Sequence, residues 1–275
     1  MRTSEVPAVV VPFSTGRQSF AAACRARDAH EGVHLLFADV KAEDADNYRF
    51  LRESAAVLGL PLHVVSDGRT PWQVAFDEHM IPNSKVPLCS RRLKHEPSAA
   101  WMNENAPDAL VVTGVDWDEQ ERRLPGIIAG HAPRTVWAPL CEPPYMFARD
   151  YDALIRSFGI EPPRMYAHGY AHANCAGACF RAGISAWVHL LKDSPALYAE
   201  NERQEQEFRA LYGDHAILRH RSGPKEGQPL ALRELRGMVE DNATIDMFDW
   251  GGCGCMPGDT GDVMLTISPR PTSPS

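Results

Sequence analysis

The feature that most constrains the fold is a regular alternation of short apolar runs with longer helical stretches in the first half of the chain. The apolar runs have the length and the β-branched content of buried strands, and they lie at 9–13, 33–38, 62–65, 109–112 and 135–138. Stretches with helical spacing separate several of these runs, at 20–30, 44–58 and 93–105. Strands that alternate with helices in this way form βαβ units. The sequence therefore predicts an α/β fold with a parallel sheet.

The second half of the chain has a different pattern. Helices are expected at 147–158, 180–192, 195–212 and 230–239, and a loop at 221–228. Ser194 is the expected cap of the third helix, with Pro195 at its first position. We predict an α/β domain over 1–145, a helical extension that carries cysteines over 146–271, and a disordered tail over 272–275.

Composition and charge narrow the class of protein. No run approaches 18 apolar residues, and the first residues do not resemble a signal peptide, so we expect a cytoplasmic protein without membrane segments. The net charge of −8 argues against a general nucleic-acid binder, unless Arg122, Arg123 and Arg134 form a local basic patch. The oligomeric state stays open.

A polar turn follows the first predicted strand and precedes a helix. Backbone N–H groups at such a turn, together with the helix dipole, bind phosphate in many α/β proteins. Gly16 allows a close backbone approach, and two serine hydroxyls can donate hydrogen bonds. The candidate phosphate-binding residues are Ser14, Thr15, Gly16, Arg17, Gln18 and Ser19.

This turn resembles the PP-loop of N-type ATP pyrophosphatases, and within that group the phosphoadenosine-phosphosulfate (PAPS) reductases and their relatives. Three further segments agree in order and spacing: Phe37-Ala38-Asp39 with Glu43, the run Pro87 to Lys94 with Pro97, and Thr113 to Arg123. The resemblance covers roughly residues 6–180. It implies an adenine nucleotide alpha hydrolase-like (HUP, Rossmann-like) domain that binds ATP or an adenosine phosphosulfate, with Asp39, Gly114, Arg122 and Arg123 near the nucleotide.

Two positions of the turn depart from the family pattern Ser-Gly-Gly-x-Asp-Ser. Thr15 stands at the first glycine, a conservative change if the backbone there does not require glycine. Gln18 stands at the aspartate and removes a negative charge beside the phosphates. Magnesium-dependent cleavage of ATP is therefore less favoured than nucleotide binding, and magnesium stays open as a cofactor. The acidic run Asp116, Asp118, Glu119 and Glu121 is interpreted as a solvated loop, with magnesium binding as its alternative.

Seven cysteines give a second signal. Cys24 and Cys141 are interpreted as small buried apolar residues. Four others form two close pairs, Cys175 with Cys179 and Cys253 with Cys255. Close thiols in a reducing compartment are usually metal ligands or redox groups. At a spacing of four, the first pair would lie on one face of a helix.

The cysteine order also resembles that of assimilatory adenylyl-sulfate reductases, which implies a 4Fe-4S cluster. Its ligands would be Cys89, Cys175, Cys179 and one of Cys253 and Cys255, because Leu88 replaces the first cysteine of the family's dyad. Zinc is the rival metal for four thiolates. The remaining C-terminal thiol would be the catalytic nucleophile.

The resemblance implies an enzyme of sulfur metabolism. In the reductase interpretation, Cys253 or Cys255 attacks a phosphosulfate, and a thioredoxin-like donor resolves the product. The alternative is an ATP-dependent iron–sulfur sulfurtransferase that thiolates tRNA, DNA or a small molecule. A third hypothesis, from another class, is a non-catalytic nucleotide-binding protein with structural zinc.

Overall fold

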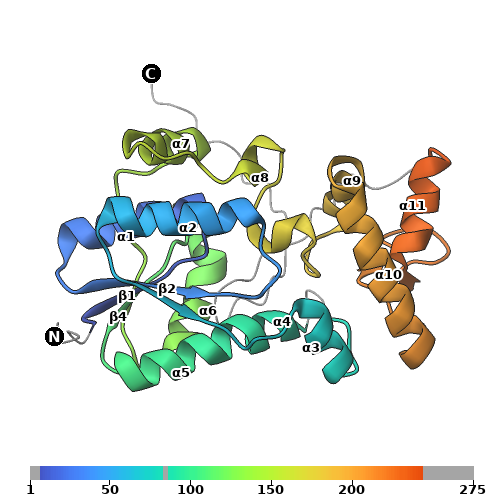
Figure 1. Ribbon diagram of the computed structural model, residues 1–275, viewed down its shortest axis with the longest axis horizontal. Helices are drawn as coiled ribbons and strands as arrows, with labels where there is room; N and C mark the ends of the chain where they lie inside the picture. Colours follow the sequence, from blue (N-terminus) through green and yellow to red (C-terminus); the bar gives the residue numbers. More distant parts are fainter. Residues whose placement is uncertain (1–6, 83–85, 244–275) are drawn as a thin grey trace.

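The computed structural model describes residues 7–82 and 86–243 of the chain. Its centre is a five-stranded parallel sheet with the order β3-β2-β1-β4-β5 (Figure 1). The strands are β1 Val9–Pro12, β2 Val33–Ala38, β3 Leu62–Val65, β4 Leu110–Val112 and β5 Val136–Trp137. Each of the five predicted runs forms one of these strands, and the predicted α/β fold class is confirmed.

Helices cover both faces of the sheet, as the apolar character of both faces of the strands requires. On one face, α1 (Arg17–Ala29), α2 (Ala45–Leu58) and α7 (Ala148–Ser157) enclose a core that includes Val11, Phe20 and Phe50. On the other face, Val10, Leu36 and Val111 pack against Met102 and Ala106 at the end of α5 (Glu96–Asn105). Figure 1 shows α1 and α2 on one side of the strands and α5 on the other.

The remaining helices of this half connect the sheet to its loops. They are α3 (Pro71–Asp77), α4 (Leu88–Ser90), the π-helical turn η1 (Arg91–His95), the 3₁₀ turn η2 (Trp117–Glu119), α6 (Gln120–His131) and the 3₁₀ turn η3 (Pro139–Cys141). The sequence analysis did not anticipate α3 or α6. The segment 116–121, expected as a solvated loop, instead forms the turn η2 and the start of α6. Asp116 accepts a hydrogen bond from the Trp117 N–H and so caps η2.

The C-terminal part is helical, as predicted, and has its own core. It contains α8 (Arg164–Ala167), the turn η4 (Asn174–Gly177), α9 (Ile184–Asp193), α10 (Pro195–Tyr212), the antiparallel pair β6 (Leu218–Arg219) and β7 (Pro229–Leu230), and α11 (Leu232–Glu240). The helix expected at 195–212 has those bounds, although the side chain of Ser194 makes no capping hydrogen bond. Trp187, Tyr198 and Phe208 are fully buried here.

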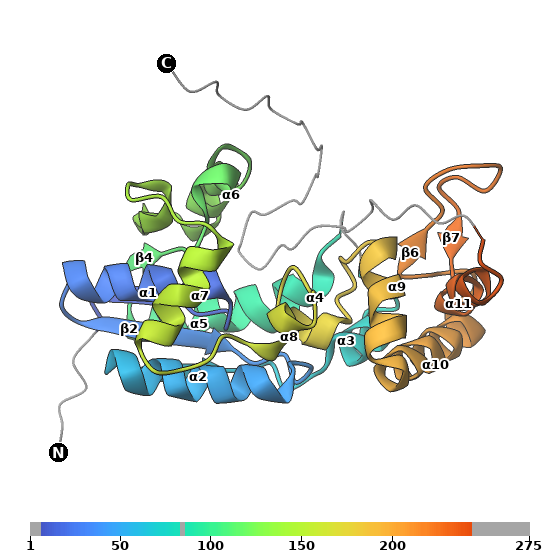
Figure 2. The ribbon, with the colours of Figure 1, turned by 90° about the horizontal axis from the view of Figure 1, so that it is seen from above.

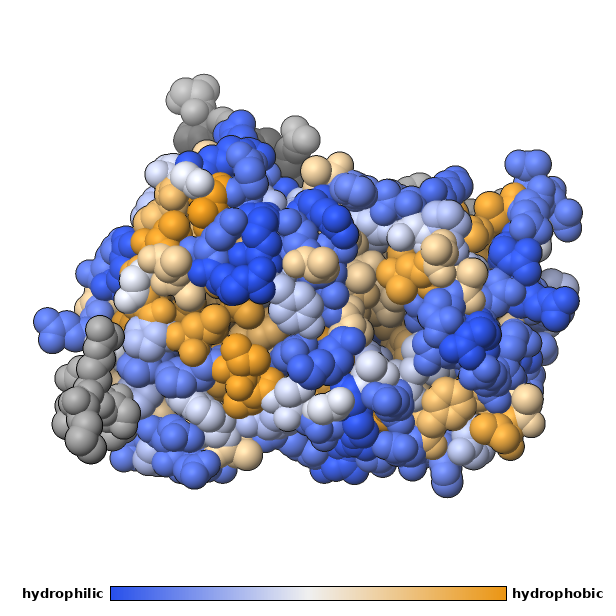
Figure 3. Space-filling view, viewed as in Figure 1, coloured by the Kyte–Doolittle hydropathy of each residue, from blue (hydrophilic) through white to orange (hydrophobic). Residues whose placement is uncertain are grey.

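Helix α3 from the first half of the chain contributes to this C-terminal core: its Trp72 packs edge-on against Phe180 and donates a hydrogen bond to Asn201 of α10. Figure 2 shows α3 beside α9 and α10 at one end of the elongated molecule. Apolar side chains on the face seen in Figure 3 form separate patches among hydrophilic ones. Within the described ranges, no helix is long and apolar enough to cross a membrane.

Candidate functional site

The sheet places the first loop where the strand order reverses. The chain passes from β1 outward to β2 and β3, and then crosses to β4 and β5 on the other side. In open α/β sheets, ligands bind beyond the carboxyl ends of the strands at such a reversal. A pocket lies there, which we name the loop pocket. Its lining includes Pro12, Ser14, Gly16, Gln18, Ser19, Thr113, Gly114, Arg123, Tyr166 and His172.

The start of α1 forms one wall of the loop pocket. Gly16 is the N-cap residue with extended backbone, and the first turn of the helix carries no acidic side chain. An anion in the pocket would therefore meet the positive end of the helix without a competing carboxylate on it. Arg17, one of the candidate phosphate-binding residues, does not line the loop pocket. Its side chain instead forms an ion pair of 2.6 Å with Asp152 of α7.

Thr15 is the strained residue of the loop. It is fully buried, has φ of +60°, and donates a hydrogen bond of 2.6 Å to the Ser14 carbonyl. A β-branched residue in the left-handed region is a genuine outlier, because its side chain collides with its own backbone there. The condition under which Thr15 would be a conservative replacement for glycine is therefore not met, because the backbone adopts the conformation that favours glycine.

Gly114 allows the segment after β4 to touch the first loop. A Cβ atom built at this position would lie 3.0 Å from the Gln18 carbonyl carbon and 3.0 Å from the Ser19 nitrogen. Both are backbone atoms at the start of α1. Gly114 thus acts here by close approach rather than by conformation, and it fixes the width of the loop pocket.

Arg123 lines the loop pocket, whereas Arg122 does not. Both guanidinium groups pair with Glu119. The acidic run therefore has structural partners in the protein: Glu119 holds the two arginines, and Asp116 accepts a hydrogen bond of 2.8 Å from the buried Tyr151 hydroxyl. Burial raises the pKa of Asp116 above its ordinary value, and the Tyr151 hydrogen bond opposes that rise.

Tyr166 was not identified from the sequence. Its hydroxyl accepts a hydrogen bond of 3.2 Å from the Arg17 backbone N–H, and the Arg17 guanidinium lies 3.7 Å from the centre of its ring. The hydroxyl thus binds one of the backbone N–H groups that the start of a helix offers to an anion. Its position, some 150 residues away in sequence, follows from the docking of α8, which no local pattern indicates.

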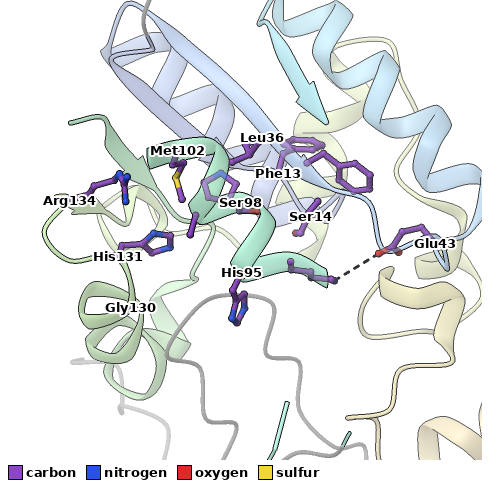
Figure 4. A pocket seen from close by; sticks show the side chains of 15 residues that line it. Phe13, Ser14, Leu36, Glu43, His95, Ser98, Met102, Gly130, His131 and Arg134 are labelled. Atoms are coloured by element: carbon purple, nitrogen blue, oxygen red, sulfur yellow. Dashed lines mark ion pairs between the residues drawn. The ribbon is translucent and has the colours of Figure 1, made fainter. Parts of the chain in front are cut away.

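A second pocket opens beyond the carboxyl ends of β1 and β2, and we name it the strand-end pocket. It shares Pro12 and Ser14 with the loop pocket. Its walls are Phe13, Leu36, Phe37 and Ala38 on one side and Lys94, His95, Ser98, Ala99 and Met102 on the other, with His131 and Arg134 at one end and Glu43 at the other (Figure 4). This largely apolar lining with polar ends fits a flat heterocycle attached to polar groups.

His131 lines the strand-end pocket, whereas Asp39 does not. Burial lowers the pKa of His131 to about 4, so the imidazole in the pocket wall is neutral at pH 7. Asp39, expected near the nucleotide, lines neither pocket: it receives hydrogen bonds of 2.8 Å from Lys41 and 2.7 Å from Tyr48. Burial raises the pKa of Asp39, but the hydrogen bonds from Lys41 and Tyr48 lower it by more, so the pKa lies below its ordinary value.

Three of the predicted ligand cysteines come together behind the strand-end pocket, and we name them the thiol cluster: Cys89, Cys175 and Cys179. Cys89 and Cys175 pack against one apolar group that includes Leu88 and Leu93. A hydrogen bond with Cys179 and burial raise the pKa of Cys175, and burial raises that of Cys89 to about 12. The Cys89 and Cys175 thiols are therefore protonated at pH 7 unless a metal replaces their protons.

A buried ion pair connects the thiol cluster to the strand-end pocket. Lys94 lies 3.9 Å from Glu43, whose side chain is 2% exposed, and Figure 4 shows this pair at one end of the pocket. Glu43 also accepts a hydrogen bond of 2.8 Å from the Cys175 backbone N–H. The positive charge of Lys94 favours the thiolate forms of Cys89 and Cys175.

The backbone around Cys175 differs from the expected helix. Cys175, Ala176 and Gly177 all have positive φ, and they form a left-handed 3₁₀ turn closed by a hydrogen bond of 2.8 Å from the Ala178 N–H to the Cys175 carbonyl. The prediction that Cys175 and Cys179 share a helical face is therefore wrong. A Cβ at Gly177 would lie 2.4 Å from the Tyr170 ring, so only glycine fits this turn. Such strain is concentrated at functional sites in proteins.

Metal binding by these residues is not established by the geometry. Among the residues that the structure describes, no group of three or more Cys, His, Asp or Glu side chains is arranged to hold a metal ion. The predicted fourth ligand and the nucleophile, Cys253 and Cys255, lie outside the described residues. Of the two cysteines interpreted as structural, Cys24 is buried and Cys141 is half-buried.

Comparisons with known proteins return similar solved structures. No protein-family model matches the chain, and no curated protein matches it. Among solved structures, the chain is similar to a phosphoadenylyl-sulfate (PAPS) reductase from Candida auris in a phosphate complex, with 19% identity, a TM-score of 0.43, and coverage of 61% of this chain and 80% of that one. It is also similar to an NH3-dependent NAD synthetase from Campylobacter jejuni, with 14% identity, a TM-score of 0.36, and coverage of 88% and 86%.

Proposed function

We propose that the chain is a PP-loop enzyme of sulfur metabolism, of the adenine nucleotide alpha hydrolase-like class, that binds an adenosine nucleotide and a 4Fe-4S cluster. One observation carries the proposal: thiols from two distant segments of the chain gather behind the strand-end pocket. The Glu43–Lys94 pair touches both, since both residues line the strand-end pocket and act on Cys175. A protein with only a structural metal has no need for this link.

The two connected pockets suit the parts of an adenosine nucleotide. The apolar walls of the strand-end pocket would take the adenine, and the amides of the first loop would take the phosphates at the start of α1. Ser14 lines both pockets and would lie at the junction of sugar and phosphate. Arg123 would place its guanidinium donors at the phosphate end, where its ion-pair partner Glu119 also lines the pocket.

The donor set around the thiol cluster suits a 4Fe-4S cluster in its chemistry. Three thiolates would come from Cys89, Cys175 and Cys179, and the fourth from Cys253 or Cys255. Lys94 and Arg181 both exert a positive potential on Cys89, which would offset the negative charge of a thiolate-ligated cluster. When bound, the cluster would supply electrostatic and redox tuning next to the nucleotide.

Gln18 favours the reductase over the sulfurtransferase. It lines the loop pocket where the PP-loop pattern has an aspartate, so the phosphates would meet an amide instead of a carboxylate that can hold magnesium. A reductase needs no cleavage at the α-phosphate. The thiolate of Cys253 or Cys255 would attack the phosphosulfate sulfur, form a sulfur–sulfur bond, and expel the adenosine phosphate as the sulfur–oxygen bond breaks. A thioredoxin-like dithiol would then supply two electrons and release sulfite.

An anaerobic turnover assay tests this proposal. Purified protein is incubated with sulfur-labelled adenosine phosphosulfate or phosphoadenosine phosphosulfate and a dithiol donor, and labelled sulfite is measured. We expect sulfite release that is lost in Cys255→Ser or Cys253→Ser and kept in the matched control Cys141→Ser. Conversion of ATP to AMP and pyrophosphate without sulfite release would favour the sulfurtransferase instead. Absence of both reactions and of nucleotide binding would refute the proposal.

A further inference from the structure

A third cavity, which we name the hairpin pocket, lies next to the thiol cluster and away from the nucleotide pockets. It is formed by the segment Phe180–Ala182, by Val86, and by the residues of the β6–β7 hairpin from Ala216 to Arg221 with Glu226 and Gly227. Phe180 directly follows Cys179 in the chain, and Val86 precedes Cys89 by three residues. Figure 2 shows the hairpin beside α9 and α11, at the end of the molecule remote from β4.

The lining of the hairpin pocket is strongly basic in a chain whose net charge is −8. Arg181, Arg219, His220 and Arg221 contribute to it, and Glu226 is the only carboxylate among the described residues that line it. Arg181 is 3% exposed, although burial of a guanidinium is costly. Convergence of several arginines on one cavity is the arrangement that recognises phosphate and other oxyanions.

The thiol cluster lies between two positive groups that belong to different pockets. Lys94 lines the strand-end pocket, and Arg181 lines the hairpin pocket. Arg181 stands two residues after Cys179 in the chain, and Lys94 stands five residues after Cys89. The two pockets therefore adjoin the thiol cluster through different segments, one at Lys94 and one at Arg181.

We propose that the hairpin pocket binds a phosphate-bearing second substrate while the nucleotide occupies the other pockets. Its role as a substrate site rests on the proposed function, whereas the binding of phosphate does not. Phosphate groups of this kind come from a small phosphorylated molecule or from a nucleic-acid strand. The hairpin arginines Arg219 and Arg221 are exposed, so a ligand from either source can reach them from solvent. Arg219 also donates a hydrogen bond of 2.7 Å to the Gly227 carbonyl.

Binding measurements on the full chain test the proposal, with the loop pocket filled by a saturating non-hydrolysable ATP analogue. Inorganic pyrophosphate is titrated by calorimetry, and a fluorescein-labelled single-stranded oligonucleotide of about ten nucleotides is titrated by anisotropy. The test variant is R219A/R221A, which changes exposed side chains only. The matched control is R149A/R233A, which removes the same charge from exposed positions outside the pocket. Circular dichroism verifies that each variant is folded.

We expect saturable binding of at least one probe, weakened about tenfold or more by R219A/R221A and less than about twofold by R149A/R233A. Binding of pyrophosphate alone identifies a small phosphorylated substrate, and tighter binding of the oligonucleotide identifies a nucleic-acid strand. R181K, which keeps the charge but loses the guanidinium fork, should weaken binding as well. Equal weakening by both double variants, or no saturable binding, would overturn the proposal. Loss of ATP-analogue binding with pyrophosphate binding intact would refute the proposed function alone.

Discussion

The close approach at Gly114 gives a prediction whose size can be derived from the structure. Gly114→Ala places a Cβ 3.0 Å from two backbone atoms at the start of α1, whereas ordinary contacts of this kind begin near 3.4 Å. The first turn of α1 must therefore move by about 0.4 Å or more. Overpacking against backbone costs about 1–3 kcal/mol, which corresponds to roughly 5- to 150-fold in an equilibrium constant.

The cost should appear mainly in nucleotide binding, because the displaced atoms form the wall of the loop pocket. We expect Gly114→Ala to weaken binding of a non-hydrolysable ATP analogue about tenfold in calorimetry, with the far-UV spectrum unchanged. Gly237→Ala is the matched control: this glycine is half-buried in α11, and nothing lies within 4 Å of the added Cβ. It should leave affinity unchanged. Affinity of Gly114→Ala within about twofold of the unmodified protein would refute the reasoning.

Three further predictions concern buried or strained groups. Burial raises the pKa of Glu205 from its ordinary value to about 7, so this carboxyl stabilises the fold below pH 4.5 and loses that contribution as the pH rises through 7. Between pH 4 and 8, the free energy of unfolding of the unmodified protein should therefore fall by roughly 3 kcal/mol more than that of Glu205→Gln. An equal change with pH in the two proteins, measured by denaturation, would contradict this. Thr15→Gly should relieve the strain at positive φ and raise the unfolding free energy by about 1 kcal/mol in urea, whereas Thr15→Ala, which keeps a Cβ, should gain less. Lys94→Met should destabilise the protein by about 1–3 kcal/mol, because it deprives the buried Glu43 carboxylate of its cation. The double variant E43Q/K94M should recover part of that loss. Strictly additive effects of the two substitutions on the unfolding free energy would show that the two side chains are not coupled.

The sheet could be predicted from the sequence because its strands are short, largely apolar runs, several of them separated by longer stretches with helical spacing. The first loop followed from the same pattern, since a turn between a buried strand and a helix must present its amides to a ligand or to water. The α10 helix was predicted to the residue, with Pro195 at its first position and Gly213 after its last.

Other parts depend on contacts that no local pattern encodes. The left-handed turn at Cys175 is held by Glu43 from a loop more than a hundred residues earlier, and helical spacing alone suggested an α-helix there. Tyr166 reaches the first loop only because α8 docks beside it. The burial of Arg181 next to the thiol cluster arises from the packing of the C-terminal core, although its position two residues after Cys179 was a signal that could have been used.

The most direct test of the account is metal analysis of protein purified without oxygen from iron-supplied cells. The unmodified chain and Cys141→Ser should be brown and contain about four irons and four sulfides each, whereas Cys89→Ser and Cys179→Ser should lose most of both. Colourless protein with one zinc, or iron content that does not depend on Cys89 and Cys179, would contradict the assignment of an iron–sulfur cluster to the thiol cluster.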